Sequence, residues 1–221
     1  VRTDQWGGSL TNRARFVLEI YREIRRQVGS DYPIGIKINS ADFQRGGFTE
    51  KESMEVIRLL GNEGIDLIEI SGGTYEKPAM VQGIQKQSTV SREAYFLDYI
   101  EKARKLIKTP LLLTGGFRTV KVMEKALEDG SLDVIGLARP FCLYPYLANQ
   151  IFDGSVKQFD TPTPRIGIKF LDKLGGVELP WYELQIQRIG NGKSPKTDLS
   201  GIFAFWFSLK SLFFKSFWKN S

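Results

Sequence analysis

Strand-like apolar runs alternate with helical patterns along this chain, and this alternation limits the fold more than any other feature. The four runs span residues 33–39, 67–71, 111–114 and 134–137. Helices are predicted between them, beginning near Thr49, Ser91 and Thr119. Alternation of this kind is typical of a parallel sheet covered by helices. We therefore expect an α/β fold, either a (β/α)₈ barrel or a doubly wound sheet.

Local signals mark where several helices begin and end. Thr49 and Glu52 have the spacing of a capping box, which opens a helix after the first strand. Gly64 and Gly130 are expected to end two of the helices. A further amphipathic helix is predicted before the first strand, over residues 12–28. Its apolar face is expected to carry Phe16, Ile20 and Ile24.

The motifs and the length favour an incomplete barrel. No G-x-G-x-x-G motif follows any of the strands, which argues against a dinucleotide-binding doubly wound unit. A closed barrel needs about 250 residues and eight strands. This chain has 221 residues and four strand–helix units. Either the other four strands belong to sequence outside this chain, or the fold is something other than a barrel.

Composition excludes several kinds of chemistry. The chain has no histidine, so it supplies no imidazole base, histidine triad or histidine metal ligand. Its single cysteine, Cys142, excludes an internal disulfide framework and fits a reducing, cytoplasmic compartment. Five lysines and one aspartate from residue 191 onward contribute +4 of the net charge of +6. The remainder of the chain is nearly neutral, which argues against nucleic acid as a partner.

The last part of the chain is aromatic and cationic. Its longest unbroken apolar run spans residues 202–207. A membrane-spanning helix needs a far longer run of roughly 20 residues. A terminal helix docked on the domain is the favoured interpretation. The alternative is a peripheral membrane contact through Ile202–Trp218.

Two consecutive strand ends carry features that suit a phosphate. Gly115 and Gly116 follow the third strand, where glycine lets backbone N–H groups approach a ligand closely. Ala138 and Arg139 follow the fourth strand, and the arginine offers a bidentate fork. Barrels often build a phosphate site from the loops after their last two strands. The alternative is a tight turn beside a surface arginine.

Lys37 is the second informative residue, because alternation along its strand places it on the face opposite the isoleucines. An inward-facing ammonium group needs an anionic partner. One interpretation is a structural ion pair with Glu69 on the next strand. The other places Lys37 beside an electron-rich ring that gains negative charge on reduction. Tyr75, in a glycine-rich loop at another strand end, either donates a hydrogen bond in a substrate pocket or belongs to a simple turn.

The segment Asp4–Arg13, which reads D-Q-W-G-G-S-L-T-N-R, closely resembles the D-x-[YW]-G-G-S-x-x-N-R signature of the old yellow enzyme family, the FMN-dependent NADH:flavin oxidoreductases. The segments around residues 36–48, 114–117 and 136–141 resemble, in order, the fifth strand with its loop and the flavin-phosphate loops of the seventh and eighth strands. The resemblance extends over residues 1–154 and more loosely to residue 196.

This resemblance implies the carboxy-terminal half of a (β/α)₈ barrel, strands 5–8, over residues 1–160, with a C-terminal helical tail over residues 161–221. It implies that FMN binds at the carboxyl ends of the strands, that NAD(P)H reduces it, and that flavin N5 passes hydride to an activated alkene such as an α,β-unsaturated carbonyl. The family's histidine pair and proton-donating tyrosine lie upstream, so no catalytic residue is expected in this chain.

The resemblance also assigns residues to the cofactor. Gly115, Gly116, Ala138 and Arg139 would hold the FMN phosphate. Lys37 occupies the place where most members have an arginine near the flavin N1 and C2 carbonyl, and a cation there stabilises the anionic reduced ring. The expected partner is a small-molecule substrate, and a homo-oligomer is compatible with the sequence.

Two other functions remain open at this point. The first is a phosphate-binding barrel of another kind, such as an aldolase or isomerase. The second is a non-catalytic half-barrel that associates with a membrane or a partner through its tail.

Overall fold

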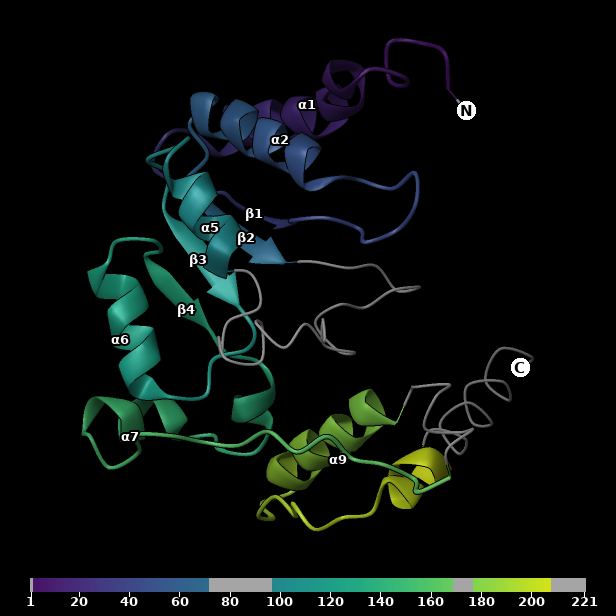
Figure 1. Cartoon of the computed structure of the whole chain (residues 1–221), viewed down its shortest axis with the longest axis vertical. Helices are drawn as coiled ribbons and strands as arrows, with labels where there is room; N and C mark the ends of the chain where they lie inside the picture. The colour runs from purple at the N-terminus through teal and green to yellow at the C-terminus, as the bar shows by residue number, and fades with distance from the viewer. Residues whose placement is uncertain (1, 72–96, 169–176, 208–221) are drawn as a thin grey trace. The chain divides into compact units, whose positions relative to one another are not determined.

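In the computed structural model of the chain (Figure 1), the described residues are 2–71, 97–168 and 177–207. The chain divides into two compact units, Val1–Gly136 and Leu137–Ser221. The predicted boundary after residue 160 follows a family motif rather than packing, and it stays a prediction.

The first unit contains a four-stranded parallel sheet in the order β1-β2-β3-β4. Its strands are β1 (Gly35–Asn39), β2 (Leu67–Ser71), β3 (Leu111–Thr114) and β4 (Val134–Gly136). Each strand pairs with the next one along the chain, as expected when a helix connects parallel neighbours. The predicted α/β fold with a parallel sheet is therefore confirmed, with small differences at the strand ends.

Four helices of the first unit are described: α1 (Leu10–Val28), α2 (Glu50–Asn62), α5 (Leu97–Arg104) and α6 (Val120–Glu128). The capping box at α2 is confirmed, because Thr49 accepts from the Glu52 N–H and Glu52 accepts from the Thr49 N–H at 3.0 Å. Gly64 and Gly130 follow α2 and α6 with φ of 83° and 67°. This left-handed conformation favours glycine. The predicted start of a helix near Ser91 lies outside the described residues.

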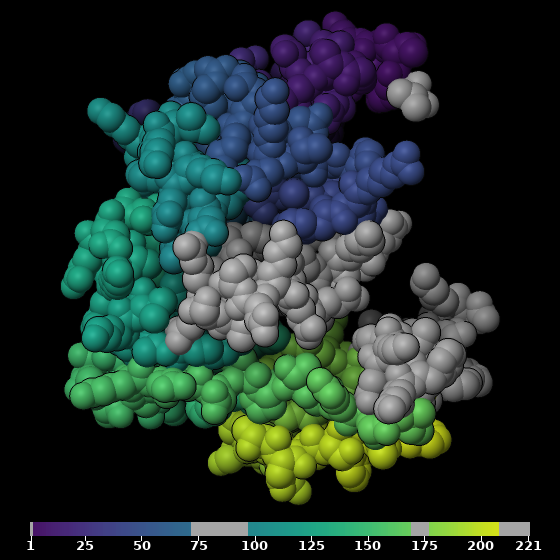
Figure 2. Space-filling model, viewed as in Figure 1, coloured from purple at the N-terminus to yellow at the C-terminus, as the bar shows by residue number. Residues whose placement is uncertain are grey.

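The core of the first unit lies on the helix-covered face of the sheet. α2 lies beside α1, as the purple and blue atoms in Figure 2 show, and α5 packs against β3. The fully buried side chains of this core come from α2, β2, α5 and β3. They are Ile57, Leu60, Ile68, Ile70, Ile100, Ala103, Leu111 and Leu113. Burying each of the large aliphatic side chains contributes roughly 1.5–3 kcal/mol.

The buried face of α1 differs from the predicted one. Phe16, Ile20 and Ile24 are 65%, 43% and 42% exposed, whereas Ala14, Leu18 and Tyr21 are buried. A polar contact accompanies this orientation. Tyr21 donates its hydroxyl to the Glu63 carbonyl at 3.2 Å, next to the end of α2. The helix therefore has two apolar faces, and periodicity alone does not say which of them is covered.

Two aspartates fasten neighbouring strands at the amino-terminal edge of the sheet. Asp66, just before β2, accepts the Ile34 N–H at 2.7 Å and pairs with Arg25 of α1. In the same way Asp133, just before β4, accepts the Leu111 N–H at 2.7 Å and pairs with Arg104 of α5. Each carboxylate thus ties the start of the preceding strand to the end of a helix.

The same two arginines also bond the loops that follow their helices. Arg25 donates to the carbonyls of Gly29 at 2.9 Å and Tyr32 at 2.7 Å. Arg104 donates to the Thr109 carbonyl at 3.2 Å. Helix end, loop and next strand are therefore joined by one guanidinium group in both places, because its five donors diverge in a plane.

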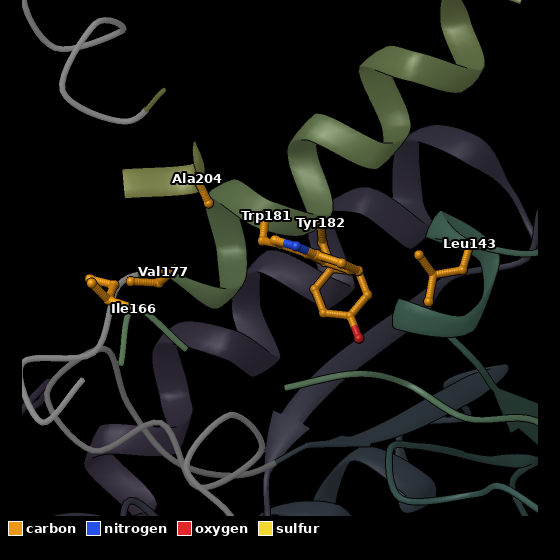
Figure 3. Close-up of a cluster of buried hydrophobic side chains, with 6 residues drawn as sticks. All are labelled: Leu143, Ile166, Val177, Trp181, Tyr182 and Ala204. Carbon is orange, nitrogen blue, oxygen red and sulfur yellow. The ribbon is translucent and has the colours of Figure 1, made fainter. Parts of the chain in front are cut away.

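The second unit is helical over much of its described part. It contains η1 (Arg139–Cys142), α7 (Leu147–Phe152), α9 (Glu178–Gly190) and a helical segment over residues 201–207. Its core gathers around α9 (Figure 3). The members of this cluster are Leu143, Ile166, Val177, Trp181, Tyr182 and Ala204.

Two aromatic side chains of α9 combine apolar burial with a satisfied polar group. The rings of Trp181 and Tyr182 meet edge to face, with centroids 5.0 Å apart. Trp181 Nε1 donates to the Leu199 carbonyl at 2.7 Å, and the Tyr182 hydroxyl donates to the Pro162 carbonyl at 2.8 Å. Buried indole and phenol groups need hydrogen-bond partners. Here the partners are backbone carbonyls, so the two bonds attach the irregular segments at Leu199 and Pro162 to α9.

The segment over residues 201–207 packs on this cluster through Ala204, which is fully buried. The docked helix expected for the tail as a whole stays a prediction. None of the helices in the described ranges combines the length and apolar character that crossing a membrane requires. Residues 208–221 lie outside the described residues.

We predict that the stability of the first unit falls in acid through Asp66. The N–H of Ile34, and then Arg25, hold the pKa of Asp66 below its usual value. This stabilisation is present above the ordinary carboxyl pKa and is lost as the pH falls toward the lowered one. Asp66→Asn should lower the free energy of unfolding at pH 7 by roughly 1 kcal/mol, since the side chain is part-exposed.

Urea unfolding at a series of pH values from neutral into the acid range measures this effect. The Asp66→Asn variant should lose less stability on acidification than the parent chain. Asp31→Asn is the matched control, because Asp31 is exposed and its one hydrogen bond within the described residues comes from the neighbouring Ser30 hydroxyl. Equal acid sensitivity of parent and Asp66→Asn would contradict the prediction.

Candidate functional site

Three polar side chains from adjacent strands meet on the face of the sheet opposite the aliphatic core. Lys37 of β1 stands opposite Glu69 of β2, and Glu69 stands opposite Leu112 of β3. Thr114 lies two residues beyond Leu112, and it therefore shares the same face. The parallel register brings Lys37, Glu69 and Thr114 together although they are distant in the sequence.

A single carboxylate oxygen joins the three side chains. Glu69 Oε1 lies 2.7 Å from Lys37 Nζ and accepts the Thr114 hydroxyl at 2.8 Å. The contact between Lys37 and Glu69 that the sequence suggested is therefore present, and the role of Lys37 beside an electron-rich ring stays a prediction. Sequence reasoning missed Thr114, because its contact depends on the register of a third strand.

Lys37 is accessible to a ligand despite this pairing. Its side chain is 53% exposed, whereas that of Glu69 is 26% exposed. Lys37 also belongs to the lining of a hollow of about 500 Å³ along α1 and β1, which includes the apolar Leu10 and Ile36 and the charged Arg13 and Asp42. Because Ile36 and the residues of α1 lie on the helix-covered face, the hollow is on the side opposite the Lys37 side chain. The half-exposed ammonium group by itself suits a ligand that carries a negative or electron-rich edge.

The chain turns sharply where β3 ends. Gly115 and Gly116 have φ of 111° and 88°. Residues with a side chain rarely adopt such values. Phe117 follows them and is fully buried, which anchors the turn. The two glycines thus have the backbone freedom that the sequence predicted for a close approach to a ligand.

Gly136 ends β4 and lies against Thr114. A Cβ atom at position 136 would stand 1.9 Å from Thr114 Oγ1 and 2.9 Å from its Cβ. Only a residue without a side chain therefore fits beside the Thr114 hydroxyl, which Glu69 holds in place. Sequence reasoning placed Gly136 in a motif but did not find this reason for it.

Arg139 of the second unit is already paired. Its guanidinium group forms an ion pair with Glu178 at the start of α9, and the two side chains are 26% and 13% exposed. A phosphate at Arg139 would have to share the guanidinium group with Glu178, which its five donors allow. Ala138 precedes η1, and its carbonyl accepts the Phe141 N–H at 3.1 Å.

The sequence did not predict the pairing between Arg139 and Glu178. The only available signal was an acidic residue at the start of a helix, a position that favours carboxylates whether or not an arginine lies nearby. The remaining predicted site residue, Tyr75, lies outside the described residues, and its role stays a prediction.

These features define a parallel α/β protein whose sheet carries an ion-paired cation on the face opposite its core and a double-glycine turn at its carboxyl edge. The family model of the NADH:flavin oxidoreductase / NADH oxidase family matches residues 1–158. The chain belongs to this family, which is a family of FMN-dependent enzymes with NADH as reductant. The resemblance drawn from the sequence is thereby confirmed.

Individual relatives agree with this assignment. The chain is 37% identical over 202 residues to an NADH-dependent flavin oxidoreductase, nadA, of Aspergillus parasiticus, covering 90% of this chain and 43% of that protein. It is 26% identical over 171 residues to a multifunctional alkene reductase/demethylase OYE of Caballeronia cordobensis, covering 77% and 24%. The chain therefore spans less than half the length of these curated relatives.

A solved structure shows the same fold. A 2-naphthoyl-CoA reductase in complex with 2-naphthoyl-CoA superimposes with a TM-score of 0.62 at 36% identity. The match covers 69% of this chain and 23% of that one. The parallel sheet and its helices thus follow the architecture of part of a larger enzyme.

We predict that Gly136→Ala destabilises the chain. The added methyl group would overlap Thr114 Oγ1. Overpacking of this kind costs about 1–3 kcal/mol. Gly190→Ala is the matched control, because nothing lies within 4 Å of a Cβ at that helical position. The control should be neutral or slightly stabilising.

Thermal and urea unfolding of both variants check this prediction. Combining Gly136→Ala with Thr114→Ala should recover part of the lost stability, because the closest clashing atom is removed. Equal unfolding midpoints for Gly136→Ala and Gly190→Ala would show that β4 moves away from Thr114 at no cost.

Proposed function

We propose that the chain supplies the FMN-binding carboxy-terminal half, strands 5–8, of a (β/α)₈ barrel oxidoreductase. Four consecutive parallel strands, membership of the flavin oxidoreductase family and the partial span of the relatives support this proposal. The observation that carries it is Lys37, a half-exposed cation on the face of the sheet opposite the core. The described donors fit FMN, because they offer a cation for the ring and a glycine turn for the phosphate.

Each of the predicted cofactor residues has a role in this proposal. Gly115 and Gly116 would offer backbone N–H groups to the phosphate, and Ala138 and Arg139 would complete its contacts, as the family resemblance implies. Lys37 would face the N1 and C2 carbonyl side of the ring. Lysine keeps the positive charge of the arginine found in most members but lacks its planar fork.

We further propose that the reaction is NAD(P)H-driven reduction of an activated alkene in a small molecule. Bound FMN supplies the hydride transfer in such a reaction. The names of the relatives support the two halves of this proposal, since one is NADH-dependent and another is an alkene reductase. Within this chain Lys37 stabilises developing negative charge, and no described residue is assigned as proton donor.

A peripheral membrane contact through Ile202–Trp218 is a second, weaker candidate. Its support is the exposure of Ile202, Phe203 and Trp206, which are 45%, 64% and 65% exposed on the described part of the segment. A homo-oligomer and a cytoplasmic location also stay predictions. Vesicle co-sedimentation that is lost when residues 202–218 are removed would favour the membrane contact.

FMN titration of the 221-residue chain tests the main proposal. Binding should change the flavin fluorescence in a saturable way, and riboflavin should bind more weakly because it lacks the phosphate. Saturable binding of a sugar phosphate in place of FMN would favour the aldolase or isomerase alternative. No response to FMN at any concentration would contradict the proposed cofactor site.

We predict that Lys37→Met slows reduction of the bound flavin by NADH more than it weakens FMN binding. The reason is that a cation near the ring stabilises the reduced, anionic form more than the oxidised one. Stopped-flow absorbance gives the reduction rate, and fluorescence titration gives the affinity. Lys102→Met is the control, because Lys102 forms a comparable pair with Glu50 between two helices.

Removal of the Arg139 side chain should weaken FMN binding. Loss of a charge-assisted phosphate contact costs on the order of 1.5–3 kcal/mol in Arg139→Ala. Glu178→Gln separates this effect from loss of the ion pair, because it frees Arg139 from Glu178 and should leave FMN affinity equal or higher. Unchanged affinity in Arg139→Ala would remove this residue from the phosphate site.

A further inference from the structure

Glu69 stands at the centre of the polar group on the sheet. Its Oε1 atom takes both hydrogen bonds, from Lys37 Nζ and from the Thr114 hydroxyl. Its Oε2 atom has no hydrogen-bond partner among the residues that the structure describes. A glutamine at this position could therefore keep both bonds through its own Oε1, while losing the negative charge.

Lys37 and Glu69 are also the only charged side chains that the four described strands place on this face. The other strand residues of the face are Gly35, Asn39, Leu67, Ser71, Leu112, Thr114, Val134 and Gly136. Lys37 Nζ and Glu69 Oε1 are 2.7 Å apart. At so short a distance the carboxylate cancels most of the field that the ammonium group would exert farther away. The strand face therefore presents a nearly neutral ion pair, not a lone cation.

The position of the ammonium group is also fixed by this contact. A lysine side chain has several rotatable bonds and loses much freedom when it is held in one place. Thr114, backed by Gly136, keeps the Glu69 carboxylate in position, and Glu69 in turn holds Lys37. The chain of contacts runs from β4 through β3 and β2 to β1.

We propose that Glu69 is a positioning residue that fixes Lys37 on the sheet face and sets the net charge that this face presents to the flavin. The inference rests on the proposed function and adds a residue to it. A lone cation would favour the anionic reduced ring strongly, whereas the neutral pair favours it less. Glu69 therefore keeps the reduction potential of bound FMN lower than Lys37 alone would set it.

The test is the midpoint potential of FMN bound to the full chain, measured by spectroelectrochemical titration. Glu69→Gln should raise the potential, shifting the equilibrium toward reduced flavin about tenfold, which is ~30 mV for a two-electron couple. Lys37→Met should shift it in the opposite direction. The double variant Lys37→Met/Glu69→Gln should return close to the parent value, because both charges of the pair are removed.

Matched variants separate charge from structure. Glu50→Gln removes the carboxylate of a similar pair, with Lys102 at 2.8 Å, and should leave the potential unchanged. Glu69→Asp keeps the charge and should restore a potential near that of the parent. If Glu69→Gln fails to fold, which circular dichroism would show, Glu69→Met provides a second neutral side chain of similar length and should raise the potential in the same direction. Thr114→Val keeps both charges of the pair and should leave the potential near that of the parent.

The outcomes distinguish the inference from the proposed function. A parent chain that does not bind FMN overturns both. A parent chain that binds FMN, with the same midpoint potential in Glu69→Gln, Glu69→Met and the parent, overturns the role of Glu69 alone. A potential that rises in Glu69→Gln and returns to the parent value in Glu69→Asp supports it, since a purely structural residue would change affinity without this pattern.

Discussion

The parallel register of the sheet is the constraint on which the candidate site depends. Asp66 accepts the N–H of Ile34 just before β1, Asp133 accepts the first N–H of β3, and arginines from two helices pair with both carboxylates. A slip of one residue would turn each side chain of a strand to the other face. Lys37 would then point among the aliphatic side chains, away from Glu69. The aspartate bonds at the amino-terminal edge of the sheet thus help to set the register that places Lys37 opposite Glu69.

Features that depend on short stretches of sequence could be predicted. The four strands follow from apolar runs, and the start of α2 follows from Thr49 and Glu52, which bond each other across three residues. The glycines after α2 and α6 adopt positive φ, which few other residues tolerate. The pairing of Lys37 with Glu69 followed from simple alternation, because both residues lie mid-strand on adjacent strands.

Features that depend on distant contacts could not be predicted. The Thr114 hydroxyl reaches Glu69 only through the offset of β3, and Gly136 is required only because Thr114 lies beside it. Arg139 was expected to be open to a ligand, yet Glu178 reaches it from a helix whose position no local pattern gives. The sequence alone shows that an arginine follows a strand. Whether that arginine is paired depends on which other segments the fold brings next to it.

The outer face of α1 has a practical consequence for work with this chain. Phe16, Ile20, Ile24 and Val28 follow one another at intervals of one helical turn, and each is at least 41% exposed. Environment-sensitive dyes that detect loosened cores bind to apolar strips of this kind. Bright dye fluorescence from a sample of the chain would therefore be compatible with a native state. Judging its integrity calls for near-ultraviolet dichroism or amide exchange instead.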